Sequence, residues 1–389
     1  MSIERIGNNC CGCRSCLQKC PLNAITFTTD EYGFEYPHIN SAACINCDLC
    51  ETVCPVVNDF TPSEITIGGM AYANDQEIKH NGSSGGLFGV FAHDTIEQNG
   101  IVFGAAFDSD LKLKTQKATT ADELMPLYKS KYLLCDTSEQ FKAIETELKN
   151  GKQVLYCSTP CQIAAIKRYL NADYDNLFTM DFVCHGVGSQ TLFDKSIAYV
   201  EKRKGIKIKQ ITFRYKKGTA SSHYYRYYYQ KNRASKQTSD LYFSFPYYNA
   251  YCKQLVCRDS CYQCKFASRN RVSDVTIGDF HTIEKYFPHV DRFAGVSMFI
   301  LNTQKGVLRF EKIKERLSYQ MMDRELLYQN NRFSVGTAPL NEVSEFRKSI
   351  ASEPFETTVQ KFLKPTKDWK KLIYYKLPRF VRKMIMKSR

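Results

Sequence analysis

The sequence predicts an α/β (α+β) protein in three parts: a small cysteine-rich N-terminal unit, a larger mixed α/β domain and a basic helical tail. Three observations support this prediction. Cysteines repeat in one spacing near the N-terminus, apolar strand-like runs alternate with amphipathic stretches further on, and basic residues gather after residue 360. A chain of 389 residues is long enough for two or three such units.

Composition places the chain in a reducing compartment. Hydrophobic residues make up 43%, no apolar run approaches the ~20 residues of a membrane helix, and the opening MSIERIGNNC has no apolar signal core. We therefore expect a cytoplasmic protein. Its 17 cysteines are then expected to bind metal rather than to form disulfides, because cytosolic thiols stay reduced.

The first part contains one motif written twice. Each copy reads C-x-x-C-x-x-C-x-x-x-C-P, and the second copy follows the first at a constant offset. Three closely spaced thiolates can bind three irons of one 4Fe–4S cubane, while the fourth cysteine, before proline, reaches the cubane of the other copy. Zinc knuckles are the alternative, but zinc sites need only C-x-x-C pairs. The expected ligands are Cys10, Cys13, Cys16 and Cys54 for cluster I, and Cys44, Cys47, Cys50 and Cys20 for cluster II.

Residues 1–60 thus resemble the bacterial two-cluster ferredoxins. A short hairpin around TTDEYG fits between the two copies, and we expect this domain to span residues 1–62. Cys11 occupies no ligand position and is expected to be a buried bystander.

A proline-containing polar run then leads into a domain expected over residues 63–345. Apolar runs and amphipathic stretches alternate there, which is typical of a mixed α/β domain. The expected strands are 101–107, 153–157, 177–183, 208–215, 275–280 and 296–302, and the expected helices are 85–98, 138–149, 160–170 and 189–203.

Three corners of this domain follow strands or precede helices. NGSSGG, at residues 81–86, would let backbone N–H groups approach a phosphate at a helix start, although a tight turn with a helix cap explains it equally well. Cys157 and Cys161 flank the Thr–Pro start of a second helix, and Cys184 and His185 follow another strand. Together these corners predict one ligand crevice. His185 is the candidate catalytic side chain, with a structural role as the alternative.

A further cysteine group is C-x-x-x-C-x-x-C at Cys257, Cys261 and Cys264. Three thiolates need a fourth, and Cys161 or Cys184 could supply it, which predicts a third iron–sulfur site. A zinc site and plain reduced thiols are the alternatives.

The motifs SSGGLF, KSKYL, STPCQIAAIKRYL, DFVCHGVGS, CRDSCYQC and SDVTIGDF span residues 68–300. In these the chain resembles the β-subunit family of deazaflavin-coenzyme (factor-420) hydrogenases and dehydrogenases, which has bacterial members linked to surface-polysaccharide synthesis. The resemblance implies FAD beside an iron–sulfur cluster. The implied FAD contacts are Ser83, Ser84, Gly85, Gly86, Lys129, Ser130, Lys131, Tyr132, Ser158 and Thr159, although Ser158 stands where the family usually has glycine.

These parts predict an iron–sulfur flavoprotein oxidoreductase. A flavin exchanges one or two electrons, so it can connect single-electron clusters with a small-molecule substrate of a polysaccharide pathway, a deazaflavin or a nicotinamide. A protein such as ferredoxin would be the electron partner. The alternative is an adaptor that feeds electrons to another enzyme and has no substrate of its own.

Charge is unevenly distributed. The tail, expected over residues 346–389, holds eleven bases and one acid after residue 360, interleaved with apolar residues as in a helix on an anionic membrane face. A solvated or docked tail is the alternative to this peripheral contact. Residues 202–236 hold twelve bases among tyrosines, but no nucleic-acid fold accompanies them. We expect a phosphorylated substrate or an acidic carrier there, and no nucleic acid.

Overall fold

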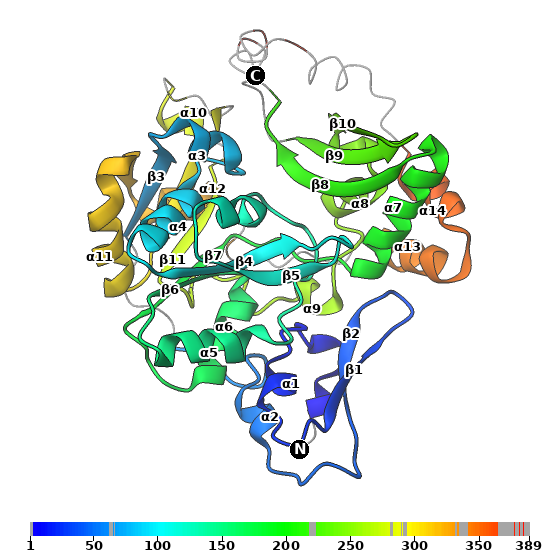
Figure 1. Cartoon of the computed structure of the whole chain (residues 1–389), viewed down its shortest axis with the longest axis horizontal. Coiled ribbons are helices and arrows are strands. Elements are labelled where there is room, and N and C mark those ends of the chain that lie inside the picture. The colour runs from blue at the N-terminus through cyan, green and yellow to red at the C-terminus, as the bar shows by residue number, and fades with distance from the viewer. Residues whose placement is uncertain are drawn as a thin grey trace.

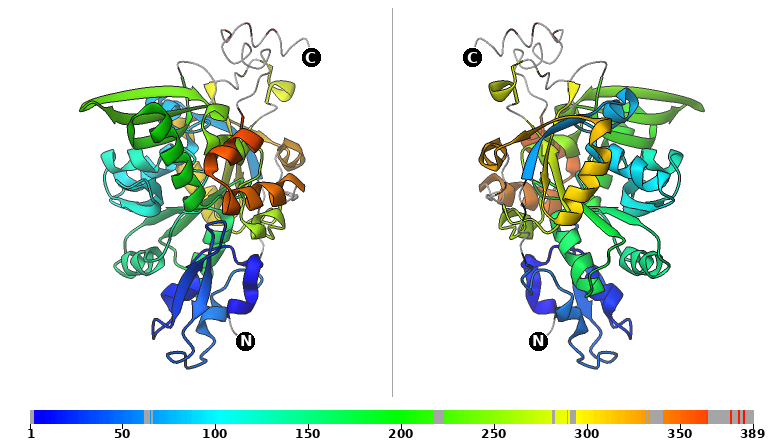
Figure 2. Two further views of the ribbon diagram at one scale, coloured as in Figure 1. Left: turned by 90° about the vertical axis from the view of Figure 1, so that its right-hand side faces the viewer. Right: turned by 90° about the vertical axis from the view of Figure 1, so that its left-hand side faces the viewer.

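The computed structural model describes residues 3–61, 65, 67–217, 223–280, 283–288, 290, 294–330, 333, 341–364, 377, 381 and 384. The N-terminal unit forms one end of the molecule, and a small antiparallel sheet, β8 to β10, lies toward the opposite end (Figure 1). The side views give the same arrangement, with the larger α/β body between these ends (Figure 2). The predicted mixed α/β class is confirmed.

The N-terminal unit is built around the expected hairpin. Strands β1 (Ile25–Thr29) and β2 (Glu35–Ile39) pair antiparallel with Ile25 opposite Ile39. The Asp30 carboxylate accepts hydrogen bonds from the backbone N–H groups of Tyr32 and Phe34, which fixes the turn locally. The remaining elements of the unit are η1 (Ile3–Asn9), α1 (Ser15–Lys19) and α2 (Leu49–Thr52).

The body is organised by one sheet that has eight strands in the described residues, in the order β13-β3-β12-β11-β7-β6-β4-β5. Its four central strands are parallel and correspond to four of the expected apolar runs. They are β4 (Ile101–Phe107), β6 (Val154–Cys157), β7 (Leu177–Phe182) and β11 (Val275–Asp279). The antiparallel strands are β3 (Ile67–Ala73), β5 (Leu113–Ala118), β12 (Ser297–Leu301) and β13 (Leu317–Met322).

Helices cover both faces of this sheet, which explains the continuous apolar character of its central strands. Leu155 faces a core shared with α4 (Leu87–Glu97) and α11 (Gln304–Ile313). Its neighbours Val154 and Tyr156 face a second core with α5 (Gln140–Lys149) and α6 (Pro160–Leu170). The parallel strands therefore end at one buried edge, where open α/β sheets place ligands.

A second sheet of three strands packs on another group of helices. It consists of β8 (Lys207–Tyr215), β9 (Tyr224–Lys231) and β10 (Ala234–Leu241) in the order β10-β9-β8. Tyr225 and Tyr227 face a large aromatic core with α7 (Gln190–Lys204) and α8 (Pro246–Cys252). The shorter elements are α3 (Gln76–Asn81), η2 (Asp122–Leu127), η3 (Tyr242–Ser244), α9 (Asp259–Tyr262), α10 (Ile283–Tyr286), η5 (Lys314–Arg316) and α12 (Arg324–Asn330).

The packed domain extends past the boundary expected at residue 345. Helices α13 (Asn341–Ser352) and α14 (Phe355–Phe362) contribute Phe346, Ile350 and Val359 to the core under the second sheet. Residues 346–363 are therefore packed, which corrects the expected start of the tail. The rest of the tail lies outside the described residues except at positions 364, 377, 381 and 384. Within the described chain, no helix combines the length and apolarity needed to cross a membrane.

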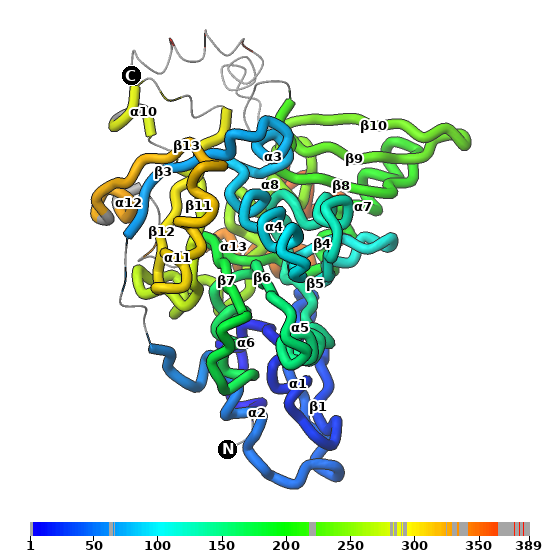
Figure 3. Tube along the Cα trace, turned by 60° about the vertical axis from the view of Figure 1, so that its left-hand side comes forward, coloured from blue at the N-terminus to red at the C-terminus, as the bar shows by residue number. Residues whose placement is uncertain are grey.

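The N-terminal unit is fixed to the body by buried hydrogen bonds. Helix α1 lies against α5 and α6 (Figure 3). The side chain of Gln18, only 4% exposed, donates to the Thr137 carbonyl at 2.7 Å and accepts from the Phe141 N–H at 2.8 Å. The Thr137 hydroxyl in turn donates to the Cys13 carbonyl at 2.7 Å. These bonds position the first cysteine motif directly against the α/β body.

Candidate functional site

The structure brings together the four cysteines expected to bind cluster I. They line one small cavity inside the N-terminal unit, and all four are buried. Cys54 belongs to the second motif, so the fourth cysteine of that copy does lie with the first three of the other copy. Burial and the neighbouring Cys10 and Cys54 raise the pKa of the Cys16 thiol, which reflects how closely these sulfurs are grouped. The four residues are Cys10, Cys13, Cys16 and Cys54.

The cysteines expected to bind cluster II are nearer the surface. Cys20 and Cys50 pack at the edge of the small N-terminal core, whereas Cys44 is half-buried and Cys47 is exposed. Ile45, between these last two, is 64% exposed. A cluster held here would therefore have a solvent-facing side.

A larger cavity, of about 150 Å³, lies where β6 and β7 end. Cavities of this volume in other proteins admit a molecule the size of benzene, so there is room for a compact polyatomic group. Its walls come from the turn after β6, the turn after β7, the segment after α9 and the N-terminal unit. The cysteines that line it are Cys11, Cys161, Cys184, Cys261 and Cys264, and His185 lines it too.

Cys257, the remaining predicted ligand, does not line this cavity. It is fully buried behind Gly186, whose φ is +107°, and a Cβ at Gly186 would lie 2.6 Å from the Cys257 sulfur. The thiol of Cys257 donates to the His185 carbonyl at 3.7 Å. Cys161 and Cys184 both lie in the cavity, so the structure offers two candidates for the fourth ligand and places Cys257 just behind the wall.

Cys11 has a more specific position than that of a bystander. It lines both the small cavity and the larger one, so it forms part of the wall between them. A hydrogen bond with Cys11 raises the pKa of the Cys161 thiol, and burial raises it further. The doubled cysteine at the start of the first motif was the sequence signal for this residue. Its spacing alone could not reveal a contact with the second domain.

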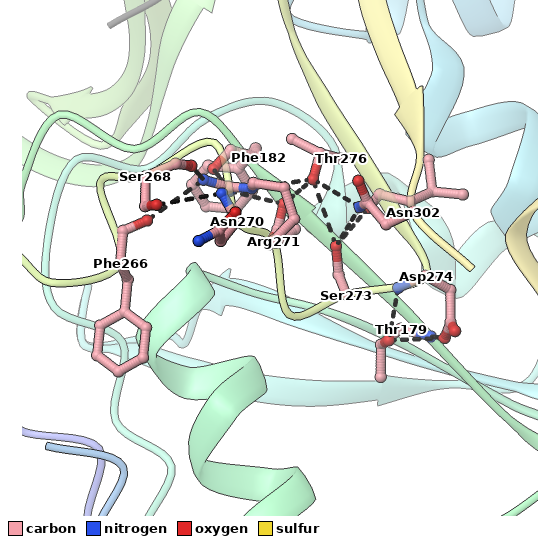
Figure 4. Close-up of polar contacts among 12 residues, drawn as sticks. Thr179, Phe182, Phe266, Ser268, Asn270, Arg271, Ser273, Asp274, Thr276 and Asn302 are labelled. Atoms are coloured by element: carbon pink, nitrogen blue, oxygen red, sulfur yellow. Dashed lines mark hydrogen bonds and ion pairs between the residues drawn. The ribbon is translucent and has the colours of Figure 1, made fainter. Parts of the chain in front are cut away.

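A buried polar network supports the larger cavity from the side of the sheet (Figure 4). Arg271, which also lines the cavity, donates to the Asp181 carboxylate at 2.8 Å and to the Thr276 hydroxyl at 3.1 Å. It also donates to the carbonyls of Phe266 and Ser268, two to four residues after Cys264. Arg271 thereby fixes the loop that presents Cys264 to the cavity.

The glycine-rich loop at residues 81–86 does not line the larger cavity. The Ser83 hydroxyl accepts a hydrogen bond from the Ser130 N–H at 2.7 Å, which joins this loop to the segment expected to contact FAD. The Ser84 hydroxyl donates to the Val296 carbonyl at 2.6 Å, and the Gly85 N–H donates to the Ser297 hydroxyl at 2.9 Å. A Cβ at Gly85 would lie 2.5 Å from the Ala71 carbonyl oxygen, so only glycine fits there.

Basic side chains surround this loop, and we call the arrangement the basic cradle: Lys129, Lys131, Arg214, Lys216 and Arg226. Arg214 donates to the Ser83 carbonyl at 3.1 Å and forms an ion pair with Asp279. Burial lowers the pKa of Lys129 to about 8 and those of Lys131 and Lys216 to about 7. In the cradle the buried Nε atoms of Arg214 and Arg226 have no hydrogen-bond partner.

The predicted contacts divide between these two places. Lys129 and Lys131 belong to the cradle, and Ser83 to Gly86 lie on the glycine-rich loop, which Ser130 joins through a hydrogen bond to Ser83. Thr159 lines the larger cavity, and Ser158 bonds to Gln162 beside it. The Tyr132 ring stacks on Tyr251 with ring centroids 4.2 Å apart, and the Tyr132 hydroxyl accepts a hydrogen bond from Arg214 of the cradle. The Tyr132 carbonyl accepts from the Gly188 N–H at 3.3 Å, next to Val187 of the cavity lining, so Tyr132 contacts both regions. The sequence predicted one crevice, but the structure has two separate sites, the basic cradle and the larger cavity. The glycine-rich loop is not part of the cavity lining.

Sequence reasoning missed Arg214, Lys216 and Arg226 as members of the cradle. They come from the basic, tyrosine-rich stretch 202–236, which was the available signal, but only the pairing of β8 with β9 brings them beside the glycine-rich loop. Among the described residues, no group of three or more His, Cys, Asp or Glu side chains is arranged to hold a single metal ion.

Comparison with known proteins agrees with this organisation. Residues 9–58 match the 4Fe-4S dicluster domain, and residues 151–325 match the C terminus of the coenzyme F420 hydrogenase/dehydrogenase beta subunit. Residues 151–325 therefore carry the C-terminal domain of this beta-subunit family. This domain contributes Arg214, Lys216 and Arg226 of the basic cradle and most of the lining of the larger cavity.

Two curated relatives match the dicluster domain of this chain. Ferredoxin-type protein NapF of Haemophilus influenzae is 39% identical over 56 residues, which cover 13% of this chain and 32% of that protein. Ferredoxin 7Fe of Hydrogenibacillus schlegelii is 39% identical over 54 residues, covering 13% and 63% respectively. The chain therefore spans less than two thirds of the length of either relative.

One solved structure is similar over a longer stretch. A chain of the F420-reducing NiFe hydrogenase complex from Methanosarcina barkeri is 14% identical, with a TM-score of 0.44. The similarity covers 77% of this chain and 92% of that chain.

Proposed function

We propose that this protein is an iron–sulfur flavoprotein oxidoreductase with three 4Fe–4S sites and one FAD site. The observation that carries the proposal is the set of five cysteines around the larger cavity, which shares the wall residue Cys11 with the cavity of the first motif. Two thiol-lined cavities on either side of one residue are what a relay of closely spaced redox centres requires. Bound clusters would supply one-electron steps, and a bound flavin would supply the change to two electrons.

The residues of the larger cavity fit a thiolate-ligated cluster. Cys161, Cys184, Cys261 and Cys264 come from three separate segments, and the Arg271 network fixes the last of these segments. Burial raises the pKa of the Cys264 thiol to about 11, and the guanidinium of Arg271 partly opposes this rise. Metal binding would remove the thiol protons. His185 would lie beside the cluster as the candidate proton donor to a substrate.

The basic cradle fits the pyrophosphate of FAD. Its buried arginine Nε atoms lack partners and its lysines are deprived of solvent, so a dianionic group would satisfy both. The tight packing around Gly85 keeps the backbone close to such a group. Tyr132, between cradle and cavity, would then face the isoalloxazine ring.

The second motif would form the electron entry or exit. Cys47 and Ile45 are exposed there, so a one-electron carrier protein can approach within a short distance of the cluster II thiols. An enzyme with its own small-molecule substrate and an adaptor that only feeds a partner both use this entry. Flavin in the cradle favours the enzyme, because an adaptor between one-electron carriers has no need of a two-electron centre.

Titration with FAD tests this proposal. We expect the anaerobically prepared full chain to quench FAD fluorescence at a stoichiometry of about one per chain. Arg226→Gln removes one unpaired cradle cation and should weaken binding by about tenfold, since a charge-assisted hydrogen bond contributes about 1.5–3 kcal/mol. Lys209→Gln, an exposed change on the same sheet, is the control. Equal FAD affinity of the two variants would contradict the assignment of the FAD site to the cradle.

A further inference from the structure

Arg258 links the two thiol-lined cavities through a single side chain. It lies between Cys257 and Cys261 in the sequence and is completely buried, with 0% exposure. Its backbone N–H donates to the Val187 carbonyl at 3.0 Å, and its own carbonyl accepts from the Cys261 N–H at 2.9 Å. The main chain of Arg258 is therefore part of the frame that holds the cysteines of the larger cavity.

The side chain of Arg258 leaves that frame and enters the N-terminal unit. Its Nε donates to the carbonyl of Cys10 at 2.5 Å, and Nη2 donates to the carbonyl of Glu35 at 2.8 Å. The guanidinium lies over the Tyr36 ring, 4.1 Å from its centroid. Both accepting groups are neutral carbonyls, so they orient the guanidinium without neutralising its charge.

The charge of Arg258 has no counter-ion among the side chains that the structure describes. No ion pair joins it to a carboxylate, and its buried Nη1 atom lacks a hydrogen-bond partner. Nη1 lies toward Gly12, between Cys11 and Cys13, where a Cβ would stand 3.5 Å from it. An unpaired buried cation is strongly unfavourable, so a negative group close by is needed to compensate for it. The thiolate sets on either side of Arg258 are the groups that can do so.

We propose that Arg258 is a positioning residue that sets the reduction potentials of the clusters bound on both sides of it. An iron–sulfur cluster gains one unit of negative charge when it accepts an electron. A fixed cation at this depth therefore favours the reduced state, since burial weakens solvent screening. Transfer of one electron across this wall oxidises one centre as it reduces the next, and Arg258 stabilises the electron in both positions.

This inference rests on the proposed function for the larger cavity only, because the dicluster domain itself is established by its family match. The readout is therefore cluster I, identified as the paramagnetic signal that Cys13→Ser removes. A chain without the third cluster would contain about eight irons instead of twelve. The proposed function would then fail while the effect of Arg258 on cluster I remained measurable.

An anaerobic redox titration of the full chain, followed by paramagnetic resonance, tests the role of Arg258. At the wild-type midpoint potential of cluster I, Arg258→Gln should lower the ratio of reduced to oxidised cluster at least tenfold, which corresponds to about 59 mV for one electron. Arg258→Lys keeps the charge but loses the planar pair of hydrogen bonds, and we expect its ratio to stay within about threefold of the wild type. Arg309→Gln is the control. It changes another largely buried arginine, which pairs with Asp94 where α11 packs beside α4, and it should leave the ratio unchanged.

Two results would overturn the proposal. An unchanged ratio in Arg258→Gln would make the residue a structural clamp between the domains. An equal tenfold fall in Arg258→Lys and Arg258→Gln would assign the effect to the hydrogen bonds instead of the charge. If Arg258→Gln does not fold or take up iron, Arg258→Lys decides alone, and a tenfold fall in that variant contradicts the proposal.

Discussion

Individual residues in the basic cradle show how much of the site depends on tertiary contacts. Lys216, directly after β8, donates to the carbonyls of Lys79 and Ser84, both at 2.5 Å, although it lies more than 130 residues away from them in the sequence. Burial, followed by the positive charges of Lys129 and Arg214, lowers its pKa to about 7. The protonation of the cradle therefore changes within the physiological pH range.

This titration predicts a pH dependence for anion binding. Above about pH 8 the cradle lysines lose their protons, so FAD or inorganic pyrophosphate should bind more weakly by at least about tenfold at pH 9 than at pH 6.5. The sign follows from the lowered lysine pKa values, because a bound anion favours the protonated form. Isothermal titration calorimetry at several pH values measures how steeply the affinity for the anion falls with pH. Lys216→Met should flatten it, and an identical slope in that variant would exclude Lys216 as a contributor.

At the scale of elements, docking of helix α1 on the body depends on Gln18. Gln18→Ala leaves the Phe141 N–H buried without a partner and removes one of the two hydrogen bonds to the Thr137 carbonyl, so the free energy of unfolding should fall by about 1–3 kcal/mol. Denaturant unfolding of the cluster-loaded chain measures this. Gln237→Ala, at an exposed position of β10, is the control and should change stability by less than about 0.5 kcal/mol. Equal losses would mean that this docking contact contributes no more than a surface side chain.

The duplicated motif leads to a second prediction at this scale. Because Cys54 lies with Cys10, Cys13 and Cys16, we expect Cys20 to serve the cluster held by the second motif. Cys20→Ser should therefore perturb the paramagnetic signal that depends on Cys47 and leave the signal that depends on Cys13 intact. Damage confined to the Cys13-dependent cluster would refute the crossing of ligands between the two copies.

The sequence predicted those elements whose residues have a strong periodic or apolar pattern. The parallel strands were found because both of their faces are buried, as the partition of Val154 and Leu155 between two cores illustrates. Strand β10 was missed because ASKQTSDL is almost entirely exposed and carries no apolar signal. Helices α13 and α14 were assigned to the tail because their apolar residues pack on a core that only the assembled second sheet creates.

At the scale of the whole molecule, the cysteine spacing predicted which residues would gather but not how the two thiol sets would meet. The relative position of the two thiol sets depends on Gln18, Arg258 and Lys265. Each of these side chains forms a hydrogen bond across the boundary between the N-terminal unit and the body. Lys265, directly after Cys264, donates to the Asn58 carbonyl at 3.0 Å. These bonds fix the two thiol-lined cavities relative to each other, which would keep constant the separation of any centres bound in them.

The basic tail gives a prediction for the whole chain in the presence of membranes. Eleven bases after residue 360 should hold the protein on anionic vesicles, since each contributes up to about 1 kcal/mol near the surface, and added salt should release it. Flotation with anionic and neutral liposomes compares the full chain with a version ending at Leu363, the last of the described residues that packs in the core. Equal flotation of both versions would show that the tail is not an anchor.

The central claim, a third cluster and a flavin beyond the dicluster domain, is tested most directly by the iron and FAD content of the anaerobically reconstituted chain. We predict about twelve irons and about one FAD per chain, falling to about eight irons when Cys261 and Cys264 are both replaced by serine. Lys209→Gln should retain the full content. About eight irons in the wild type, unchanged by the double replacement, would contradict the account.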